Sequence, residues 1–256
     1  MTEPFDLTGR VAIVTGANTG IGQGVAIALA SAGADLALVG RSSMTETADA
    51  VRTRGRRAVE IQADLSTVAP VATVIAETLG ALGDIDILVN NAGIIRRADA
   101  LDFTEADWDA VMDTNLKTAF FLCQAVGRHM IERFARDGRR GKIVNVASIL
   151  SFQGGIRVPS YTASKSGLAG ITRLLANEWA ARGVNVNAIA PGYITTNNTA
   201  ALQADATRSW QILERIPAGR WGTPADIGGA AVFLASSAAD YVHGHVLAVD
   251  GGWLAR

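Results

Sequence analysis

Short apolar runs alternate with longer amphipathic segments along most of this 256-residue chain. The apolar runs are rich in Val, Ile and Leu and predict strands, whereas the longer segments have the three-to-four-residue spacing of helices. Strands are expected to begin at Val11, Leu36, Ala58, Ile85, Lys142, Val184 and Val246, and helices to cover 21–31, 45–53, 107–134 and 161–181. Strands that are apolar on both faces are typical of a parallel sheet covered by helices on each side. The pattern therefore predicts an α/β fold.

The alternation continues without a proline- or serine-rich linker and without a repeat, so residues 1–256 are expected to form one domain. We expect a single doubly wound parallel sheet of the Rossmann type, which binds ligands outside the carboxyl ends of its strands. Segment 197–222 has weak periodicity and two tryptophans, Trp210 and Trp221. It is expected to be a helical lid over the substrate or, alternatively, a fixed peripheral pair of helices.

Composition narrows the functional classes. Hydrophobic residues make up 49% of the chain and charged residues 18%, which excludes a disordered chain, and a net charge of -1 does not favour nucleic-acid binding. Cys123 is the only cysteine, so no internal disulfide can form, and no metal-binding spacing occurs. The chain has neither a signal-peptide pattern nor an apolar run near the ~20 residues of a membrane helix. We expect a cytoplasmic protein without metal or membrane.

The first strand ends in the glycine-rich turn T-G-A-N-T-G-I-G. Gly16, Gly20 and Gly22 permit a tight turn and a close approach to a pyrophosphate at the start of the next helix. The spacing differs from the common G-x-G-x-x-G, and a purely structural turn is the alternative. We predict a dinucleotide site at this turn, with three further residues in contact with the cofactor: Asn18, Thr19 and Ile21.

The end of the second strand indicates which dinucleotide is bound. Gly40 stands where an acidic residue would bind the adenosine ribose of NAD, and Arg41 and Ser42 follow it. A guanidinium group suits a 2′-phosphate, and Ser42 can add a hydrogen-bond donor. We therefore predict that NADP(H) is preferred and that NAD(H) is the alternative. An arginine that is merely exposed to solvent is the other interpretation.

The ends of the third and fourth strands add further candidates. Asp64, followed by Leu65, is placed either to meet the adenine amino group or to cap the next helix. The fourth strand ends in N-N-A-G, and its small residues would let the cofactor ribose lie close to the backbone: Asn91, Ala92 and Gly93.

The segment after the fifth strand carries the candidate chemistry. Ser148 follows the apolar run, and Tyr161 and Lys165 stand one helical turn apart in a helix expected to begin near Pro159. A tyrosine beside an ammonium group is a plausible acid or base, because a positive charge and the helix dipole both favour the phenolate. Tyr-x-x-x-Lys alone is a loose pattern that also occurs on ordinary helix surfaces.

Taken together, the glycine turn, N-N-A-G, Ser148 with Tyr161-x-x-x-Lys165 and Pro191-Gly192 make the sequence resemble the short-chain dehydrogenase/reductases over essentially its whole length. The resemblance implies that Tyr161 is the general acid/base and that Ser148 holds the substrate oxygen. It also implies that Lys165 binds the nicotinamide ribose and lowers the pKa of the tyrosine. Asn115 would support a water-linked proton relay.

The resemblance assigns a cofactor role to the segment after the sixth strand as well. Pro191 and Gly192 line the nicotinamide site, and the backbone of Ile194 and the hydroxyl of Thr196 would hold the carboxamide. The substrate carbon would then lie between the nicotinamide and Tyr161, so that hydride and proton reach it from opposite sides.

A narrower resemblance is to the family members that oxidise or reduce sugar acids. It is carried by the segments following Ser148 and Pro191, by R-I-P-A-G-R-W-G and by the terminal D-G-G-W-L-A-R. A carboxylate substrate requires a cation, and an amide can bind a sugar hydroxyl. The candidates for these roles are Arg96, Arg157, Arg215 and Gln153.

Family members commonly form homotetramers, and Trp253-Leu254 is expected to be exposed and to contribute a subunit contact. Two other functions remain open. The chain could be a 3-oxoacyl or other carbonyl reductase on the same frame, or a dinucleotide-sensing protein without turnover.

Overall fold

The computed structural model describes residues 3–256. The seven strands are β1 (Val11–Thr15), β2 (Asp35–Gly40), β3 (Ala58–Gln62), β4 (Ile87–Asn90), β5 (Gly141–Val146), β6 (Val184–Pro191) and β7 (Val246–Val249). The α-helices are α1 (Gly20–Ser31), α2 (Thr45–Arg52), α3 (Val71–Leu82), α4 (Glu105–Met112), α5 (Thr118–Asp137), α6 (Pro159–Trp179), α7 (Ala200–Ala204), α8 (Ala206–Arg215) and α9 (Pro224–Ala235).

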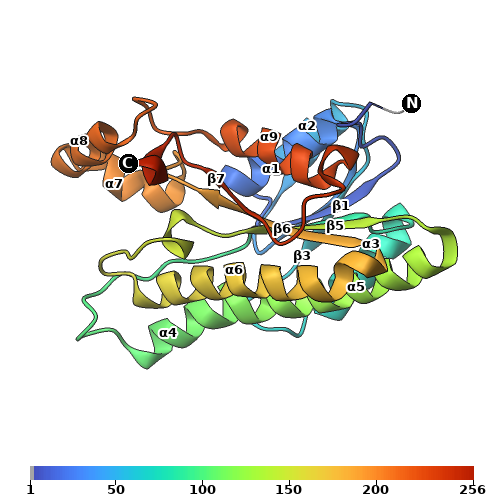
Figure 1. Cartoon of the computed structure of the whole chain (residues 1–256), viewed down its shortest axis with the longest axis horizontal. Coiled ribbons are helices and arrows are strands. Elements are labelled where there is room, and N and C mark those ends of the chain that lie inside the picture. The colour runs from blue at the N-terminus through green and yellow to red at the C-terminus, as the bar shows by residue number, and fades with distance from the viewer. Residues whose placement is uncertain (1–2) are drawn as a thin grey trace.

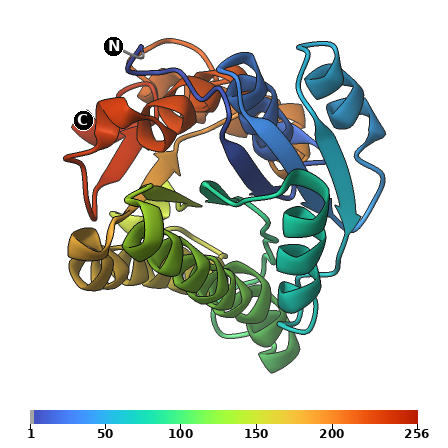
Figure 2. The same cartoon turned by 90° about the vertical axis from the view of Figure 1, so that its right-hand side faces the viewer.

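All strands pair in parallel in one sheet of order β3-β2-β1-β4-β5-β6-β7. One layer of helices contains α1 and α9, and the layer on the other face contains α3, α5 and α6 (Figures 1 and 2). The predicted doubly wound sheet of the Rossmann type is thus confirmed. The order reverses between β1 and β4, which is where such sheets bind their ligands.

Alternate residues of a strand enter two separate cores, which explains why the strands are apolar throughout. In β1, Ala12 and Val14 pack with α1 and α9, whereas Val11 and Ile13 pack with α3, α5 and α6. Both faces of the strand are removed from water, so neither face can carry polar side chains at low cost.

Two helices, α3 and α9, were not among the predicted elements. The sequence of α9 includes Gly228 and Gly229, which lower intrinsic helix propensity. Gly228 is needed for packing, because a Cβ at this position would lie 2.7 Å from the Cβ of Ala28 on α1. Close packing between α1 and α9 thus outweighs the weak helical signal.

The continuous helix expected over 107–134 is interrupted. The structure has α4, a π-helical turn over Asp113–Lys117, and then α5. The turn adds one residue to the local repeat and brings Asn115 inside, where it is buried. The prediction of one uninterrupted helix was therefore wrong at this point.

The C-terminal tail is packed inward. Trp253 is only 4% exposed and packs against Ile149, Ile212 and Ile216. The expectation that this tryptophan is exposed for a subunit contact was wrong, because its own chain already covers it. Within the described residues, no helix combines the length and apolar character needed to span a membrane.

Candidate active site

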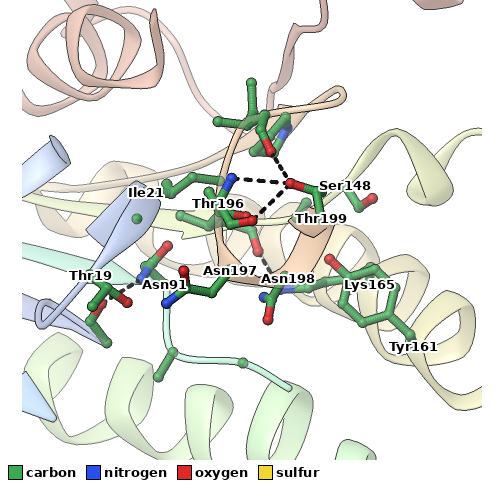
Figure 3. Close-up of a pocket in the computed structure, with 18 of the residues that line it drawn as sticks. Thr19, Ile21, Asn91, Ser148, Tyr161, Lys165, Thr196, Asn197, Asn198 and Thr199 are labelled. Atoms are coloured by element: carbon green, nitrogen blue, oxygen red, sulfur yellow. Dashed lines mark hydrogen bonds between the residues drawn. The ribbon is translucent and has the colours of Figure 1, made fainter. Parts of the chain in front are cut away.

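A cleft of about 260 Å³ opens at the carboxyl ends of the strands. Figure 3 shows Thr19, Ile21 and Asn91 on one side of it and Tyr161 and Lys165 on the other. Its walls come from five loops and helix starts, and the lining residues are Gly16, Asn18, Thr19, Gly20, Ile21, Asn91, Ala92, Gly93, Val146, Ala147, Ser148, Tyr161, Lys165, Pro191, Gly192, Ile194, Thr196, Asn197, Asn198 and Thr199.

The glycine turn forms the floor of one end of the cleft. Gly16 and Gly20 have positive φ values of 63° and 59°, which residues with a Cβ rarely adopt. Gly22 lies behind the turn, where a Cβ would collide with the carbonyl oxygen of Gly16. The turn can therefore present the amino end of α1 to an anionic group at close range.

The N-N-A-G loop is hydrogen-bonded to the end of β1. The Thr15 hydroxyl accepts the N–H groups of Asn91 and Ala92 at 3.0 Å each, and the Asn91 amide donates to the Thr15 carbonyl at 2.9 Å. Asn91 therefore fixes two loops that line the cleft relative to each other. Ala92 and Gly93 line the cleft as small residues.

Arg41 and Ser42 lie together at the exposed end of β2, beyond the main cleft. Asn18 donates to the Ser42 hydroxyl at 2.9 Å, which joins this corner to the glycine turn. Arg41 is exposed, and no carboxylate of the described residues lies within salt-bridge distance of it. A phosphate group on the adenosine ribose would meet this unpaired guanidinium.

Asp64 does not cap a helix, because α3 begins only at Val71 with Pro70 before it. Its carboxylate instead accepts the Ser66 N–H at 3.0 Å, and this hydrogen bond, together with the Arg41 charge, holds the pKa of Asp64 below its usual range. The capping interpretation was therefore wrong. Asp64 and Leu65 lie outside the lining of the main cleft, at the edge that Arg41 shares.

Tyr161 and Lys165 project into the cleft from the first turns of α6, with the Lys165 Nζ 5.6 Å from the centre of the Tyr161 ring. Burial raises the pKa of Tyr161, while the Ser148 hydroxyl and the Arg97 guanidinium favour the phenolate and act in the opposite direction. Burial also lowers the pKa of Lys165 to about 8. The pKa of Tyr161 is thus raised and not lowered as expected, because desolvation outweighs the Ser148 hydrogen bond and the Arg97 charge.

Lys165 is held in place by the end of β5. Its ammonium group donates to the Val146 carbonyl at 2.6 Å, and its side chain is buried. Ser148 follows on the same strand end, with its hydroxyl accepting the Leu150 N–H at 3.1 Å. The three polar groups of the predicted site thus rest on rigid elements, β5 and α6.

Asn115 supports the neighbouring wall. Its Oδ1 accepts the Ile94 N–H at 2.8 Å, and its Nδ2 donates to the Ile94 carbonyl at 2.9 Å. Gly93 lies between Asn115 and Lys165, since a Cβ there would be 3.1 Å from the Asn115 Oδ1 and 3.7 Å from the lysine Nζ. The amide of Asn115 is therefore engaged in holding the loop beside Lys165.

The segment after β6 forms the roof of the cleft. Pro191 ends the strand, Gly192 and Ile194 follow it, and Thr196 begins a short 3₁₀ turn over Asn197–Thr199. The Thr196 side chain faces the glycine turn, because its Cγ2 would lie 3.3 Å from a Cβ at Gly20. Thr196 and the glycine turn are thus close enough for one ligand to contact both.

Two of the arginines predicted to bind substrate are already paired with carboxylates. Arg96 Nε lies 3.2 Å from Asp107, and Arg157 Nε lies 3.5 Å from Asp99. Both side chains are more than half exposed and lie outside the lining of the cleft. The structure therefore does not bring them together with Tyr161.

Arg97, which was not among the predicted residues, reaches the site instead. Its Nη2 donates to the Asn198 carbonyl at 3.1 Å across the mouth of the cleft, and its charge favours the Tyr161 phenolate. The chain places two adjacent arginines after N-N-A-G, and the sequence does not distinguish which one turns inward. The N-N-A-G motif indicates that this loop contributes to the site, but it does not indicate which of the two arginines does so.

Gln153 and Arg215 both contact Trp253, and both lie outside the lining of the cleft. The Gln153 Oε1 accepts the Trp253 Nε1–H at 3.2 Å, and the Arg215 guanidinium lies 4.1 Å from the centre of the same indole. Trp253 therefore connects two predicted substrate residues that are distant in the sequence. Within residues 3–256, no group of three His, Cys, Asp or Glu side chains could hold a metal ion.

Known proteins share this architecture and much of the sequence. A family model described as enoyl-(acyl carrier protein) reductase matches residues 16–254. The 2-dehydro-3-deoxy-D-gluconate 5-dehydrogenase of Escherichia coli is 58% identical over 252 residues, covering 98% of each protein. The chain belongs to the short-chain dehydrogenase/reductase family.

Two solved structures of short-chain dehydrogenase/reductases extend the comparison. One, from Agrobacterium tumefaciens, is provisionally named 2-deoxy-d-gluconate 3-dehydrogenase and holds NADP; it is 58% identical, with a TM-score of 0.90 and full coverage of both chains. The other is a gluconate 5-dehydrogenase from Burkholderia cenocepacia with NADP and tartrate, 40% identical with a TM-score of 0.92, covering 99% of this chain and 98% of that one.

As a short-chain dehydrogenase/reductase, the protein is an oxidoreductase. The cleft fits a nicotinamide dinucleotide: glycines without room for a Cβ form the cradle, and an unpaired arginine lies at its far edge. Such a cofactor supplies or accepts the hydride, while the chain orients the reactants and handles the proton. The Tyr161 phenol, the Ser148 hydroxyl and the Lys165 ammonium group all line the cleft and can form hydrogen bonds to a substrate oxygen.

Proposed function

We propose that the protein is an NADP(H)-preferring dehydrogenase of sugar acids that interconverts a secondary alcohol and a ketone on substrates such as 2-dehydro-3-deoxy-gluconate, 2-deoxy-gluconate or gluconate. The observation that carries the proposal is that the glycine cradle and the Ser148, Tyr161 and Lys165 side chains open into the same cleft. The names of the relatives from Escherichia coli and Burkholderia cenocepacia support the substrate class.

In this proposal, each side chain has a role set by its surroundings. Tyr161 exchanges the proton of the substrate oxygen, and its raised pKa keeps the phenol protonated and ready to donate in the reducing direction. Ser148 holds the same oxygen, and Lys165, fixed by the Val146 carbonyl, binds the nicotinamide ribose. Asn115 keeps the Ile94 backbone in place beside them.

The segment 197–222 is proposed to act as a substrate lid. Its α8 has one apolar face, with Ile212 buried, while Trp210 on the same helix is 62% exposed. The hydrogen bond from Arg97 to the Asn198 carbonyl spans the mouth of the cleft. The segment is also joined to the C-terminal tail, through the Ala218 N–H that donates to the Gly251 carbonyl and through the packing of Ile212 and Ile216 on Trp253, so opening would break these contacts as well.

We also propose that the protein works in the cytoplasm as a homotetramer. Its single cysteine, Cys123, is buried as a free thiol, so the fold uses no disulfide and needs no oxidising compartment. Large apolar side chains lie exposed on three neighbouring helices: Trp108 on α4, Phe121 on α5 and Leu174 on α6. Light scattering of the purified protein is expected to give four times the mass of the chain.

An activity screen tests the substrate class. Purified protein is mixed with NADPH or NADP and with a panel of keto and hydroxy sugar acids, matched uncharged sugars and a 3-oxoacyl thioester, and the nicotinamide absorbance is followed. Turnover of sugar acids above the other classes is expected. Turnover restricted to the thioester would favour the carbonyl-reductase alternative, and cofactor binding without turnover of any compound would favour a dinucleotide sensor.

Arg41→Ala is expected to raise the KM for NADPH by about 10- to 100-fold, the range of a lost charge-assisted hydrogen bond. The KM for NADH in the same variant should stay within about twofold, because NADH carries no phosphate at this position. NADH is thus the internal control in steady-state kinetics with both cofactors. Equal losses for the two cofactors would refute the role of Arg41.

A further inference from the structure

Resting on the proposed function, we infer that the carboxylate of the substrate binds at a rim subsite made by Arg215, Tyr193 and Gln153 around the indole of Trp253. The three residues come from α8, from the loop after β6 and from the loop after β5. They meet only because the C-terminal tail folds back between them. Figure 1 shows the C-terminus beside α7 and α8, at the end of the molecule where this loop cluster lies.

The first argument is which of the candidate arginines already has a carboxylate partner. Arg96 and Arg157 each face an aspartate, whereas no carboxylate of the described chain lies within 4.0 Å of Arg215. Its guanidinium carbon lies over the Trp253 ring, 4.1 Å from the ring centre. A cation–π contact of this kind takes up none of the N–H donors, which stay available for a carboxylate.

The second argument is the set of donors beside Arg215. The Tyr193 ring lies 4.7 Å from the Trp253 ring, and its hydroxyl makes no hydrogen bond to the described residues. Trp253 can only donate, so its bond to Gln153 occupies the amide oxygen and leaves the amide NH₂ as a donor. Guanidinium, hydroxyl and amide donors around one apolar ring match an anion with several acceptor sites.

The subsite continues from the reactive cleft. Tyr193 stands between Gly192 and Ile194, which both line the cleft, and Ile149 follows Ser148 directly. Ile149 packs in the same apolar cluster as Trp253. A sugar acid with its reacting hydroxyl at Tyr161 must therefore reach past Ile149 and Ile194 to place its terminal carboxylate beside Arg215.

The tail that carries Trp253 is firmly fixed. The Asp250 carboxylate accepts the N–H groups of Gly252 at 2.8 Å and of Leu254 at 2.9 Å. Gly251 and Gly252 take positive φ values of 65° and 89° to turn the chain back. Trp253 is therefore a positioning residue, since it orients Gln153 and Arg215 and is itself buried.

Arg215→Met tests the subsite without risk to the core, because Arg215 is exposed. With NADP, we expect the KM for gluconate to rise about 10- to 100-fold, the range for losing hydrogen bonds to a charged group, while kcat stays within about twofold. The kcat/KM for the corresponding uncharged sugar alcohol should not change. Arg173→Met, which replaces an exposed arginine of α6 far from the rim, is the matched control.

Calorimetric titration of gluconate into the protein with NADP separates the subsite from the proposed activity. Weaker binding to Arg215→Met but not to Arg173→Met supports the subsite even if the wild type shows no turnover, in which case only the proposed function fails. Turnover of sugar acids with an unchanged KM in Arg215→Met would overturn the subsite alone. It would also be overturned if the wild type bound no gluconate or if only Arg97→Met lost the preference for the acid.

Discussion

Tyr161→Phe is expected to lower kcat for sugar-acid turnover by about 10³-fold, within the 10²- to 10⁴-fold range of general acid–base catalysis. In the proposed mechanism the phenol transfers the proton, and neither Ser148 nor Lys165 is expected to replace it. Ser148 has an ordinary hydroxyl, and the Lys165 ammonium is bound to the Val146 carbonyl. The substitution removes one oxygen and keeps the ring, so NADP binding measured by fluorescence titration should be retained.

The control for this substitution is Tyr241→Phe, because Tyr241 is fully exposed and distant from the cleft. It should leave kcat within about twofold of the wild type. In the wild type, ketone reduction should fall and alcohol oxidation should rise with increasing pH, since the first consumes the phenol proton and the second requires its loss. A Tyr161→Phe variant with unchanged kcat would exclude the tyrosine as the acid.

That Ser148, Tyr161 and Lys165 meet the glycine turn in one cleft could be predicted, because these segments follow strand ends; Asn115, in a π-helical turn between two helices, has no such signal. Tyr161 and Lys165 lie one turn apart on a helix whose start is marked by Pro159, so their common face follows from helix geometry. The pKa of Tyr161 could not be predicted in the same way. It depends on how much water the folded cleft excludes, and that is a property of the packing of distant segments.

The partners of the arginines near the site could not be predicted from the sequence. Arg96 and Arg97 are adjacent and chemically identical, yet Arg96 pairs with Asp107 and Arg97 crosses to Asn198. Arg157 likewise forms an ion pair with Asp99. Only the tertiary structure determines which guanidinium group already has a carboxylate partner. The burial of Trp253 also depends on tertiary structure, because the side chains that cover it come from distant segments.

The largest expected effect on stability concerns Arg133, which lies at the opposite end of the sheet from the site. Its side chain is 1% exposed, and its Nη1 lies 3.0 Å from both Asp84 and Asp86. Asp86 is also contacted by Arg10 at 3.0 Å and by Arg139 at 2.7 Å. Three arginines and two aspartates thus form one ion-pair network where β1, β4 and α5 meet.

Arg133→Met is expected to lower the free energy of unfolding by about 3 kcal/mol at pH 7, as measured by denaturant titration at fixed protein concentration. This is the lower end of the range for removing one partner of a buried ion pair, because Arg10 and Arg139 still neutralise Asp86. The matched control is Arg136→Met on the same helix. Its side chain is 69% exposed and pairs with Asp137 on the surface, so it should cost less than about 1 kcal/mol.

The effect of Arg133→Met should shrink in acid, and this distinguishes lost charge pairing from lost packing. Burial alone would raise the pKa of Asp84, but the hydrogen bonds from His129 and the Ile85 N–H, with the Arg133 charge, outweigh it and lower the pKa to about 2. A carboxyl with a depressed folded pKa stabilises the protein above about pH 4, and this contribution of about 2 kcal/mol disappears as the pH falls toward 2. The wild type therefore loses more stability than Arg133→Met between pH 5 and 2, because the protonated Asp84 no longer forms an ion pair with the guanidinium. A difference between the two proteins that is as large at pH 3 as at pH 7 would instead show that Arg133 acts through its packing.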